Sequence, residues 1–141
     1  MKISKEQKEK LVAEAKKALE RVYPADNPFV FASAVLTKAG NIFSSANYGS
    51  DSASLSLHDT QAALAHAAAH GEGDIVAIAV TSQEKHEKGE FTNPCHMCKQ
   101  LLHENSLHSG LQILVILVNE HGETKEVDLS EMINFPWPKK V

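Results

Sequence analysis

The chain has 141 residues, of which 43% are hydrophobic and 23% charged, with a net charge of −4 at pH 7 and a pI of about 6.0. This size is typical of one domain whose core needs no disulfide staples, so we expect a single domain over residues 1–141. The acidic balance excludes a protein held on nucleic acid mainly by phosphate contacts, and we expect no nucleic-acid partner. A nucleoside-like small molecule as partner is compatible with this acidic charge.

The sequence carries no targeting or membrane signal that we recognise. Its lysine-rich start leads into an amphipathic stretch rather than an apolar leader. The longest apolar run, Ile113 to Val118, is far too short to span a bilayer. Two cysteines, Cys95 and Cys98, do not make a disulfide framework. We therefore expect a cytoplasmic protein in which the C-x-x-C pair binds a metal or does redox chemistry.

The first half of the chain predicts a helix, a hairpin and a second helix. Ser4 and Gln7 can form a capping box at the first helix, and Pro24 ends it. Ser56 can cap the second helix, with Asp59 at its third helical position, and Gly71 closes it. The predicted elements are a helix over 4–22, strands over 29–36 and 42–47, a Gly/Ser/Asp-rich loop over 48–56 and a helix over 58–70.

In the second half, buried strands alternate with a helix. Asn93 and Pro94 are typical of a helix start, and Gly110 is typical of a helix end. Strands alternating with helices indicate a layered α/β fold. The predicted elements are a strand over 75–80, a charged surface loop over 82–93, a helix over 94–110, strands over 111–118 and 124–129, and a helical turn over 130–133.

The candidate chemistry lies at the start of the helix after Pro94. A helix N-terminus stabilises thiolates, and a spacing of three puts Cys95 and Cys98 on one face, within reach of one ion. His58 also begins a predicted helix and is a candidate third ligand. Three protein ligands leave the fourth position open, which is typical of a catalytic zinc. Thiol redox chemistry through the two cysteines is the alternative.

These motifs resemble those of the zinc-dependent cytidine deaminases, in which H/C-x-E is followed by P-C-x-x-C. The resemblance covers nearly the whole chain: residues 29–35 are similar to the family's first strand, and 99–102 to its Arg-Gln-x-Leu. It implies a three-layer α/β/α fold with a mixed central sheet. It also implies a homodimer or homotetramer with sites near the subunit contacts.

The resemblance also assigns site residues. It implies that Zn²⁺ is held by His58, Cys95 and Cys98, with the backbone N–H of Cys95 facing the zinc-bound water or the substrate. It implies that Phe29 and Asn47 contact the substrate, since Asn47 lies eleven positions before His58, as the family's Asn does before its first ligand.

The chain departs from the family at two positions. The family's proton-shuttling Glu, two positions after the first ligand, is replaced by Thr60, and its ribose-gripping Glu, two positions after the Asn, by Gly49. A Thr hydroxyl cannot shuttle protons near neutral pH, and loss of general acid–base catalysis typically costs about 10²–10⁴-fold. We therefore expect an intact zinc site without the usual shuttle and without standard ribose recognition.

Several residues are candidates to replace the shuttle, and the sequence does not choose among them. Asp59 is adjacent to Thr60 but rotated by about 100° around the helix, so helix capping is its favoured interpretation. The other candidates are Asp51, Ser52, Glu87, Glu90 and His96.

We also interpret two histidines and two aromatic residues of the tail. His66 and His70 have an i, i+4 metal-ligand spacing but fall on outward positions, so we expect an exposed surface. Phe135 and Trp137 resemble the family's C-terminal aromatic residues, which often lie near a neighbouring subunit's active site; anchoring of the tail is the equal alternative.

Two main functions follow. The first is a zinc-dependent hydrolytic deaminase acting on cytidine or a related amino-substituted heterocycle, and the second is a deaminase-fold protein that binds zinc or a nucleoside without turnover.

Overall fold

The computed structural model of the chain describes residues 2–141. Its elements follow the predicted order, with differences at the ends of several of them. In chain order they are α1 (Lys5–Ala18), β1 (Phe31–Thr37), β2 (Ile42–Ala46), α2 (Asp59–Ala69), β3 (Ile75–Ser82), α3 (His96–Ser109), β4 (Leu114–Val118) and β5 (Thr124–Asp128), with short 3₁₀ turns η1 (Leu19–Arg21), η2 (Ala53–Leu55) and η3 (Leu129–Met132).

The strands form one mixed sheet in the order β2-β1-β3-β4-β5. β1 pairs antiparallel with both β2 and β3, and β4 pairs antiparallel with β5. β3 and β4 are parallel, and α3 makes the crossover between them. In a parallel pair the chain must return along the outside of the sheet, so α3 starts near the end of the sheet where β3 finishes.

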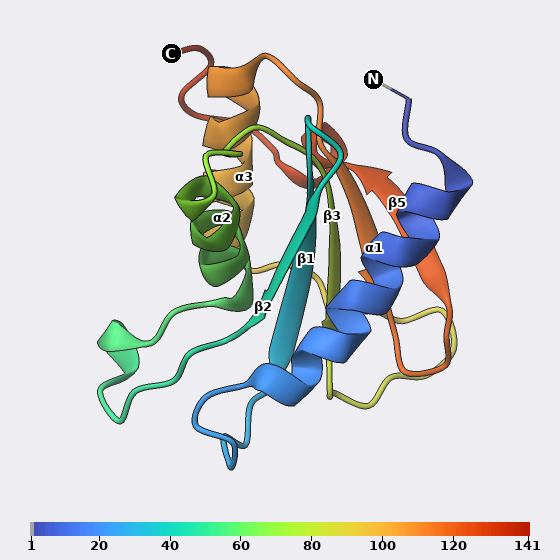
Figure 1. Cartoon of the computed structure of the whole chain (residues 1–141), viewed down its shortest axis with the longest axis vertical. Helices are drawn as coiled ribbons and strands as arrows, with labels where there is room; N and C mark the ends of the chain where they lie inside the picture. Colours follow the sequence, from blue (N-terminus) through green and yellow to red (C-terminus); the bar gives the residue numbers. More distant parts are fainter. Residues whose placement is uncertain (1) are drawn as a thin grey trace.

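Helices cover both faces of the sheet, which confirms the predicted three-layer α/β/α architecture (Figure 1). α1 lies on one face, where Leu11 and Ala15 pack against Ala77 and Ala79 of β3. α2 and α3 lie on the other. None of the helices within residues 2–141 is long and apolar enough to cross a membrane.

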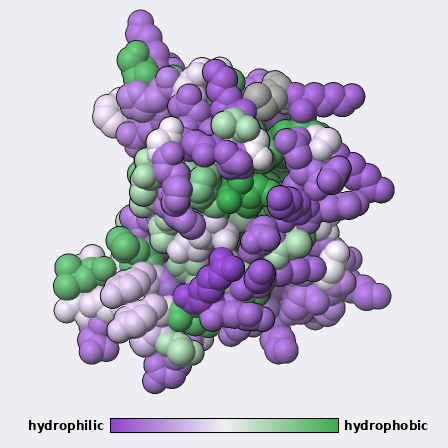
Figure 2. Space-filling view, viewed as in Figure 1, coloured by the Kyte–Doolittle hydropathy of each residue, from purple (hydrophilic) through white to green (hydrophobic). Residues whose placement is uncertain are grey.

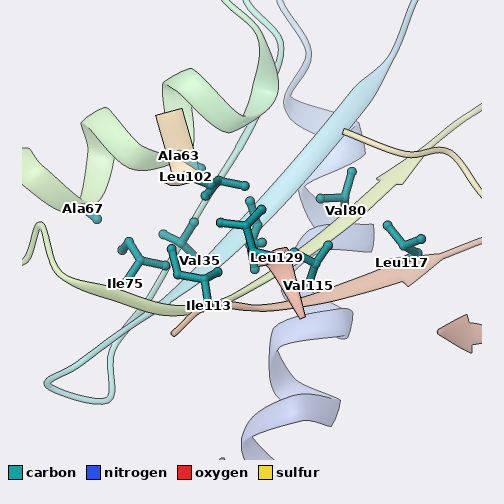
Figure 3. Close-up of a cluster of buried hydrophobic side chains, with 11 residues drawn as sticks. Val35, Ala63, Ala67, Ile75, Val80, Leu102, Ile113, Val115, Leu117 and Leu129 are labelled. Atoms are coloured by element: carbon teal, nitrogen blue, oxygen red, sulfur yellow. The ribbon is translucent and has the colours of Figure 1, made fainter. Parts of the chain in front are cut away.

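The core under α2 and α3 is aliphatic (Figure 3). Ile78 and Val80 of β3 point into this cluster, on the face opposite Ala77 and Ala79, as the two-residue period of a strand requires. Leu102 of α3 is completely buried in it. The packing therefore ties the helix that carries both cysteines to the centre of the sheet.

The starts of α2 and α3 differ from the prediction. α2 begins at Asp59 with His58 as its N-cap, and Gln61 at the third helical position accepts the His58 N–H at 2.7 Å. The predicted cap, Ser56, instead accepts the backbone N–H of Ser50 at 2.9 Å. Asp59 is thus the first helical residue rather than the third, and the predicted Ser56–Asp59 capping box is wrong.

α3 has Cys95 as its N-cap, in place of the predicted Asn93. It ends at Gly110, whose φ of 73° is the left-handed geometry that glycine accepts without strain. β1 begins at Phe31, two residues later than predicted, and leaves Phe29 before the strand with 70% of its surface exposed. Both shifts move residues with candidate roles out of regular elements and into loops.

Candidate metal centre and adjoining groove

The starts of α2 and α3 bring His58, Cys95 and Cys98 together. The Nδ1 atom of His58 lies 3.2 Å from the Cys95 sulfur and 3.5 Å from the Cys98 sulfur, and the two sulfurs are 3.4 Å apart. All three ligand atoms fall within 4.8 Å of one another. The sequence therefore predicted that these three residues lie together, although His58 is 37 positions from Cys95 and 40 positions from Cys98.

The donor set and its spacing fit a zinc ion. A tetrahedral zinc, with Zn–S of about 2.3 Å and Zn–N of about 2.0–2.1 Å, holds its ligand atoms roughly 3.5 Å apart. One imidazole nitrogen and two sulfurs at 3.2–3.5 Å match this spacing, and the three protein ligands leave one position open. His58, Cys95 and Cys98 can therefore hold Zn²⁺ in the manner of a catalytic rather than a structural site.

Local hydrogen bonds hold the ligand side chains in position without a bound ion. The Cys95 sulfur accepts the backbone N–H of Cys98 at 3.4 Å, as an N-cap side chain does. Desolvation, with the neighbouring Cys95 thiol, raises the pKa of Cys98 to about 12, against a weaker opposing hydrogen bond from Thr60. Without a cation the buried sulfur is a thiol, and a bound divalent ion supplies the charge that stabilises the thiolate.

A broad groove of about 1080 Å³ opens onto this cluster. Its wall includes four aromatic residues, Tyr23, Phe29, Phe31 and Tyr48, and the Tyr23 and Tyr48 rings stack with centroids 4.7 Å apart. Apolar side chains also gather on the projecting loop with η2, at lower left in Figures 1 and 2, where Leu55 is 69% exposed. The groove has the size and aromatic character of a site for a planar heterocycle.

Asp59 and Thr60 occupy different surroundings although they are adjacent. Asp59 lines the groove with His58 and the two cysteines, and its Oδ2 accepts the Ser33 hydroxyl of β1 at 2.5 Å. Thr60 is 1% exposed and does not line the groove; its hydroxyl lies 3.1 Å from Ser33 Oγ. The Asp59 carboxyl is buried against the sheet, and burial raises its pKa despite hydrogen bonds from Ser33 and from the backbone of Asp59 and Thr60 at the helix start, which agree with the capping interpretation.

The two residues expected to contact substrate both line the groove. The Asn47 amide joins two segments of backbone: its Oδ1 accepts the Phe31 N–H at 3.0 Å, and its Nδ2 donates to the Phe29 carbonyl at 2.9 Å. Asn47 thereby holds the segment that presents the exposed Phe29 ring. One N–H of the amide is left for another acceptor.

Gly49 lies at a tightly packed position. A Cβ at this position would lie 2.6 Å from Asn27 Nδ2 and 3.2 Å from the Tyr23 carbonyl, which itself accepts the Gly49 N–H. A larger residue here would require the Asn27 side chain to move. The family's Glu is replaced at this position by a residue with no side chain to contact a ribose.

The remaining shuttle candidates separate by position. Asp51 lines the groove, whereas Ser52, Glu87, Glu90 and His96 are exposed residues outside its lining. His66 and His70 are exposed, as predicted. In the tail, Phe135 and Trp137 are 98% and 78% exposed. The tail backbone is nevertheless anchored, because Gln100 and His103 donate to the carbonyls of Trp137 and Pro138.

Comparison with known proteins identifies the family. The sequence model described as the cytidine and deoxycytidylate deaminase zinc-binding region matches residues 5–111, a segment that contains all three candidate ligands. A cytidine deaminase from Halalkalibacterium halodurans is 31% identical over 123 residues, which cover 87% of this chain and 88% of that protein. The chain belongs to the cytidine and deoxycytidylate deaminase family.

Other relatives agree with this assignment. A cytidine deaminase from Sporosarcina psychrophila is 27% identical over 132 residues, which cover 94% of this chain and 92% of that protein. The crystal structure of cytidine deaminase from Burkholderia pseudomallei superposes with a TM-score of 0.75 at 25% identity, covering 94% and 98% of the two chains. The Mycobacterium tuberculosis cytidine deaminase, at 20% identity and a TM-score of 0.72 over 92% and 95% of the chains, shares the fold.

Proposed function

We propose that this protein is a zinc-dependent hydrolytic deaminase acting on cytidine or a related amino-substituted heterocycle. The observation that carries the proposal is the meeting of His58, Cys95 and Cys98 at 3.2–3.5 Å on the wall of an aromatic-lined groove. Family membership supports the same reaction class. When bound there, Zn²⁺ supplies Lewis acidity and lowers the pKa of a coordinated water.

Asp59 is the acid–base group in this proposal. Its carboxyl shares the groove with the three ligands, whereas the Thr60 hydroxyl is buried behind it. The Ser33 hydrogen bond to Oδ2 fixes the carboxyl, which in this proposal takes a proton from water and delivers it to the ring and the leaving amine. Desolvation, which disfavours its charged form, suits a group that must also act as an acid.

Substrate contacts are assigned to other residues that line the groove. Phe29 presents an exposed ring for stacking against a planar base, and Asn47 holds the backbone that carries it and keeps one N–H for the ligand. The Cys95 backbone N–H, at the helix start, is the proposed donor to the water or the substrate. Because Gly49 offers no carboxylate to a ribose, the proposal extends from cytidine to heterocycles with a different sugar or none.

The test combines zinc analysis with ammonia release from a panel of cytidine, deoxycytidine, guanine and blasticidin-like compounds. We expect one zinc per chain and turnover of at least one compound. Asp59→Asn should lower kcat by about 10²–10⁴-fold while zinc content stays unchanged. Turnover that persists in Asp59→Asn would transfer the role to another group, with Asp51 the next candidate in the groove.

A protein that binds zinc and a nucleoside without turnover is the second candidate. The observations that favour it are Thr60, which supplies no shuttle, and Gly49, which supplies no carboxylate to a ribose. Zinc-loaded protein that binds cytidine but releases no ammonia from any member of the panel would establish it. Reversible dithiol–disulfide cycling of Cys95 and Cys98 without zinc would instead favour the redox reading.

The wider setting is proposed on the same basis. We place the protein in the cytoplasm, as one domain over residues 1–141 that assembles as a homodimer or homotetramer. The exposed Phe135 and Trp137 side chains, on a tail whose backbone is anchored to α3, suit a contact with a neighbouring subunit. Sedimentation analysis at several concentrations distinguishes the dimer from the tetramer.

A further inference from the structure

A chain of polar side chains connects the groove to the opposite side of the loop between β3 and α3. Thr92, a groove-lining residue, lies 2.9 Å from His86 Nε2 and 2.6 Å from the Ser82 hydroxyl. His86 Nδ1 lies 2.9 Å from Glu120 Oε1, in the turn between β4 and β5. The order hydroxyl, imidazole, carboxylate is one in which the carboxylate orients the ring and the ring orients the hydroxyl.

The chemistry of the partners sets the direction of each hydrogen bond. The Glu120 carboxylate only accepts, so His86 carries its proton on Nδ1, and the neutral ring presents the Nε2 lone pair to Thr92. The Thr92 hydroxyl therefore donates to His86, while Ser82 accepts the Glu84 N–H and donates to Thr92. In this state Thr92 can offer the groove only an oxygen lone pair.

Further contacts hold the loop in this position. The His86 backbone N–H donates to Glu120 Oε2, the Gly89 N–H to Glu123, and Asn119 to the Glu90 carbonyl. The His121 ring contacts the His86 carbonyl at 2.6 Å. The loop is thus clamped by the β4–β5 turn, although its sequence is that of a solvated surface loop.

We propose that Thr92 is a substrate-contacting residue whose hydroxyl accepts a hydrogen bond from a donor N–H or O–H of the ligand, and that His86 and Glu120 are positioning residues that fix this polarity. The proposal rests on the deaminase function proposed above, since it takes the groove as the ligand site. Three observations carry it: Thr92 lines the same groove as Asp59 and the cysteines, it is almost fully buried, and both of its protein partners are fixed.

Protonation of His86 reverses the polarity at Thr92. His86 Nε2 then donates to the Thr92 oxygen, and the Thr92 hydrogen is released toward Ser82 or the groove, where a ligand donor meets it unfavourably. Binding of a donor-bearing ligand should therefore weaken as His86 becomes protonated. The charged and titratable groups around His86 are Glu84, Lys85, Glu87, Lys88 and Glu90 of its own loop and Glu120, His121 and Glu123 of the clamping turn.

The experiment measures cytidine binding to the zinc-loaded protein by calorimetry between pH 5.5 and 8, together with ¹⁵N NMR of the His86 ring. We compare Thr92→Val, which removes only the hydroxyl, with His86→Gln and Glu120→Gln. His108→Gln, on the exposed face of α3, is the matched control. We expect Thr92→Val to weaken binding about 5- to 10-fold with unchanged zinc content, and His86→Gln to bind with a smaller pH dependence than His108→Gln.

The NMR measurement is independent of any ligand. It should show neutral His86 with its proton on Nδ1, and Glu120→Gln should shift the tautomer equilibrium. Equal cytidine affinity in the parent protein and Thr92→Val, or a proton on Nε2 of neutral His86, would overturn the inference. If the parent protein neither binds cytidine nor deaminates any member of the panel, it is the proposed function that fails, and the tautomer then decides the positioning role alone.

Discussion

Asp59 and Thr60 illustrate how much one position matters at the start of a helix. Both residues contact Ser33, but only Asp59 lines the groove with the zinc ligands. The chain has a carboxylate next to the position at which its family carries the proton shuttle, one residue earlier along α2. In the proposed function, the difference between an active deaminase and an inactive binder depends on this one buried carboxyl group.

Moving the carboxylate tests this directly. Thr60→Glu alone would place a second carboxylate beside Asp59 in a fully buried position, and should destabilise the fold. Asp59→Ala combined with Thr60→Glu relieves that repulsion. We expect the double variant to deaminate cytidine at least 10-fold faster than Asp59→Ala alone, measured by ammonia release. Equal rates in the two proteins would mean that the groove does not present a substrate to position 60.

Glu120 gives a pH prediction. Desolvation raises the pKa of its carboxyl, but hydrogen bonds from its own backbone and from the backbone and ring of His86 outweigh this and lower the pKa to about 2 from a reference of 4.5. Because the folded pKa is the lower one, the stabilisation is complete above about pH 4.5 and is lost as pH falls toward 2.

The measurement is the urea midpoint of the parent protein and Glu120→Gln at pH 7 and pH 3. The advantage of the parent protein should shrink at pH 3. An advantage of equal size at both values would show that the carboxylate is not selectively stabilised in the folded state.

At the scale of elements, α1 and α3 have different tasks. Leu11 of α1 and Leu102 of α3 are both completely buried, but they pack on opposite faces of the sheet. Of these two helices, only α3 carries zinc ligands. Packing on the α3 face should therefore affect both stability and the metal, and packing on the α1 face only stability.

Leu11→Ala and Leu102→Ala are a matched pair for this prediction. Each should lower the free energy of unfolding by about 2–5 kcal/mol, the usual cost of a buried Leu→Ala change. Leu102→Ala should in addition weaken zinc binding several-fold in competition with a chelator, while Leu11→Ala leaves it unchanged. Similar zinc affinities in the two variants would mean that the cysteines are held by the loop before α3 rather than by the helix.

The sequence predicted much of this structure because the relevant signals are local. Helix starts at His58 and before Cys98, and the apolar periods of the strands, can be read within a few residues. Three features could not be read this way. Asp59 is hydrogen-bonded to Ser33, 26 positions away, and Gly49 packs against Asn27. The charged loop around His86 is held by a hydrogen bond to Glu120, 34 positions away. Each depends on which segments the sheet topology brings together.

At the scale of the whole molecule, the proposed metal centre joins α2 to α3. These helices carry ligands from distant parts of the chain, so a bound ion adds its binding free energy to that of folding. The thiols must lose protons to bind, and the raised pKa of Cys98 makes zinc affinity increase with pH.

The most direct test is elemental analysis of the purified protein and of Cys98→Ser, with thermal unfolding before and after a chelator. We expect one zinc per chain in the parent protein, none in Cys98→Ser, and a Tm that falls on chelation in the parent protein only. A protein that purifies without zinc, takes up none when it is supplied, and unfolds at the same temperature with and without chelator would contradict this expectation.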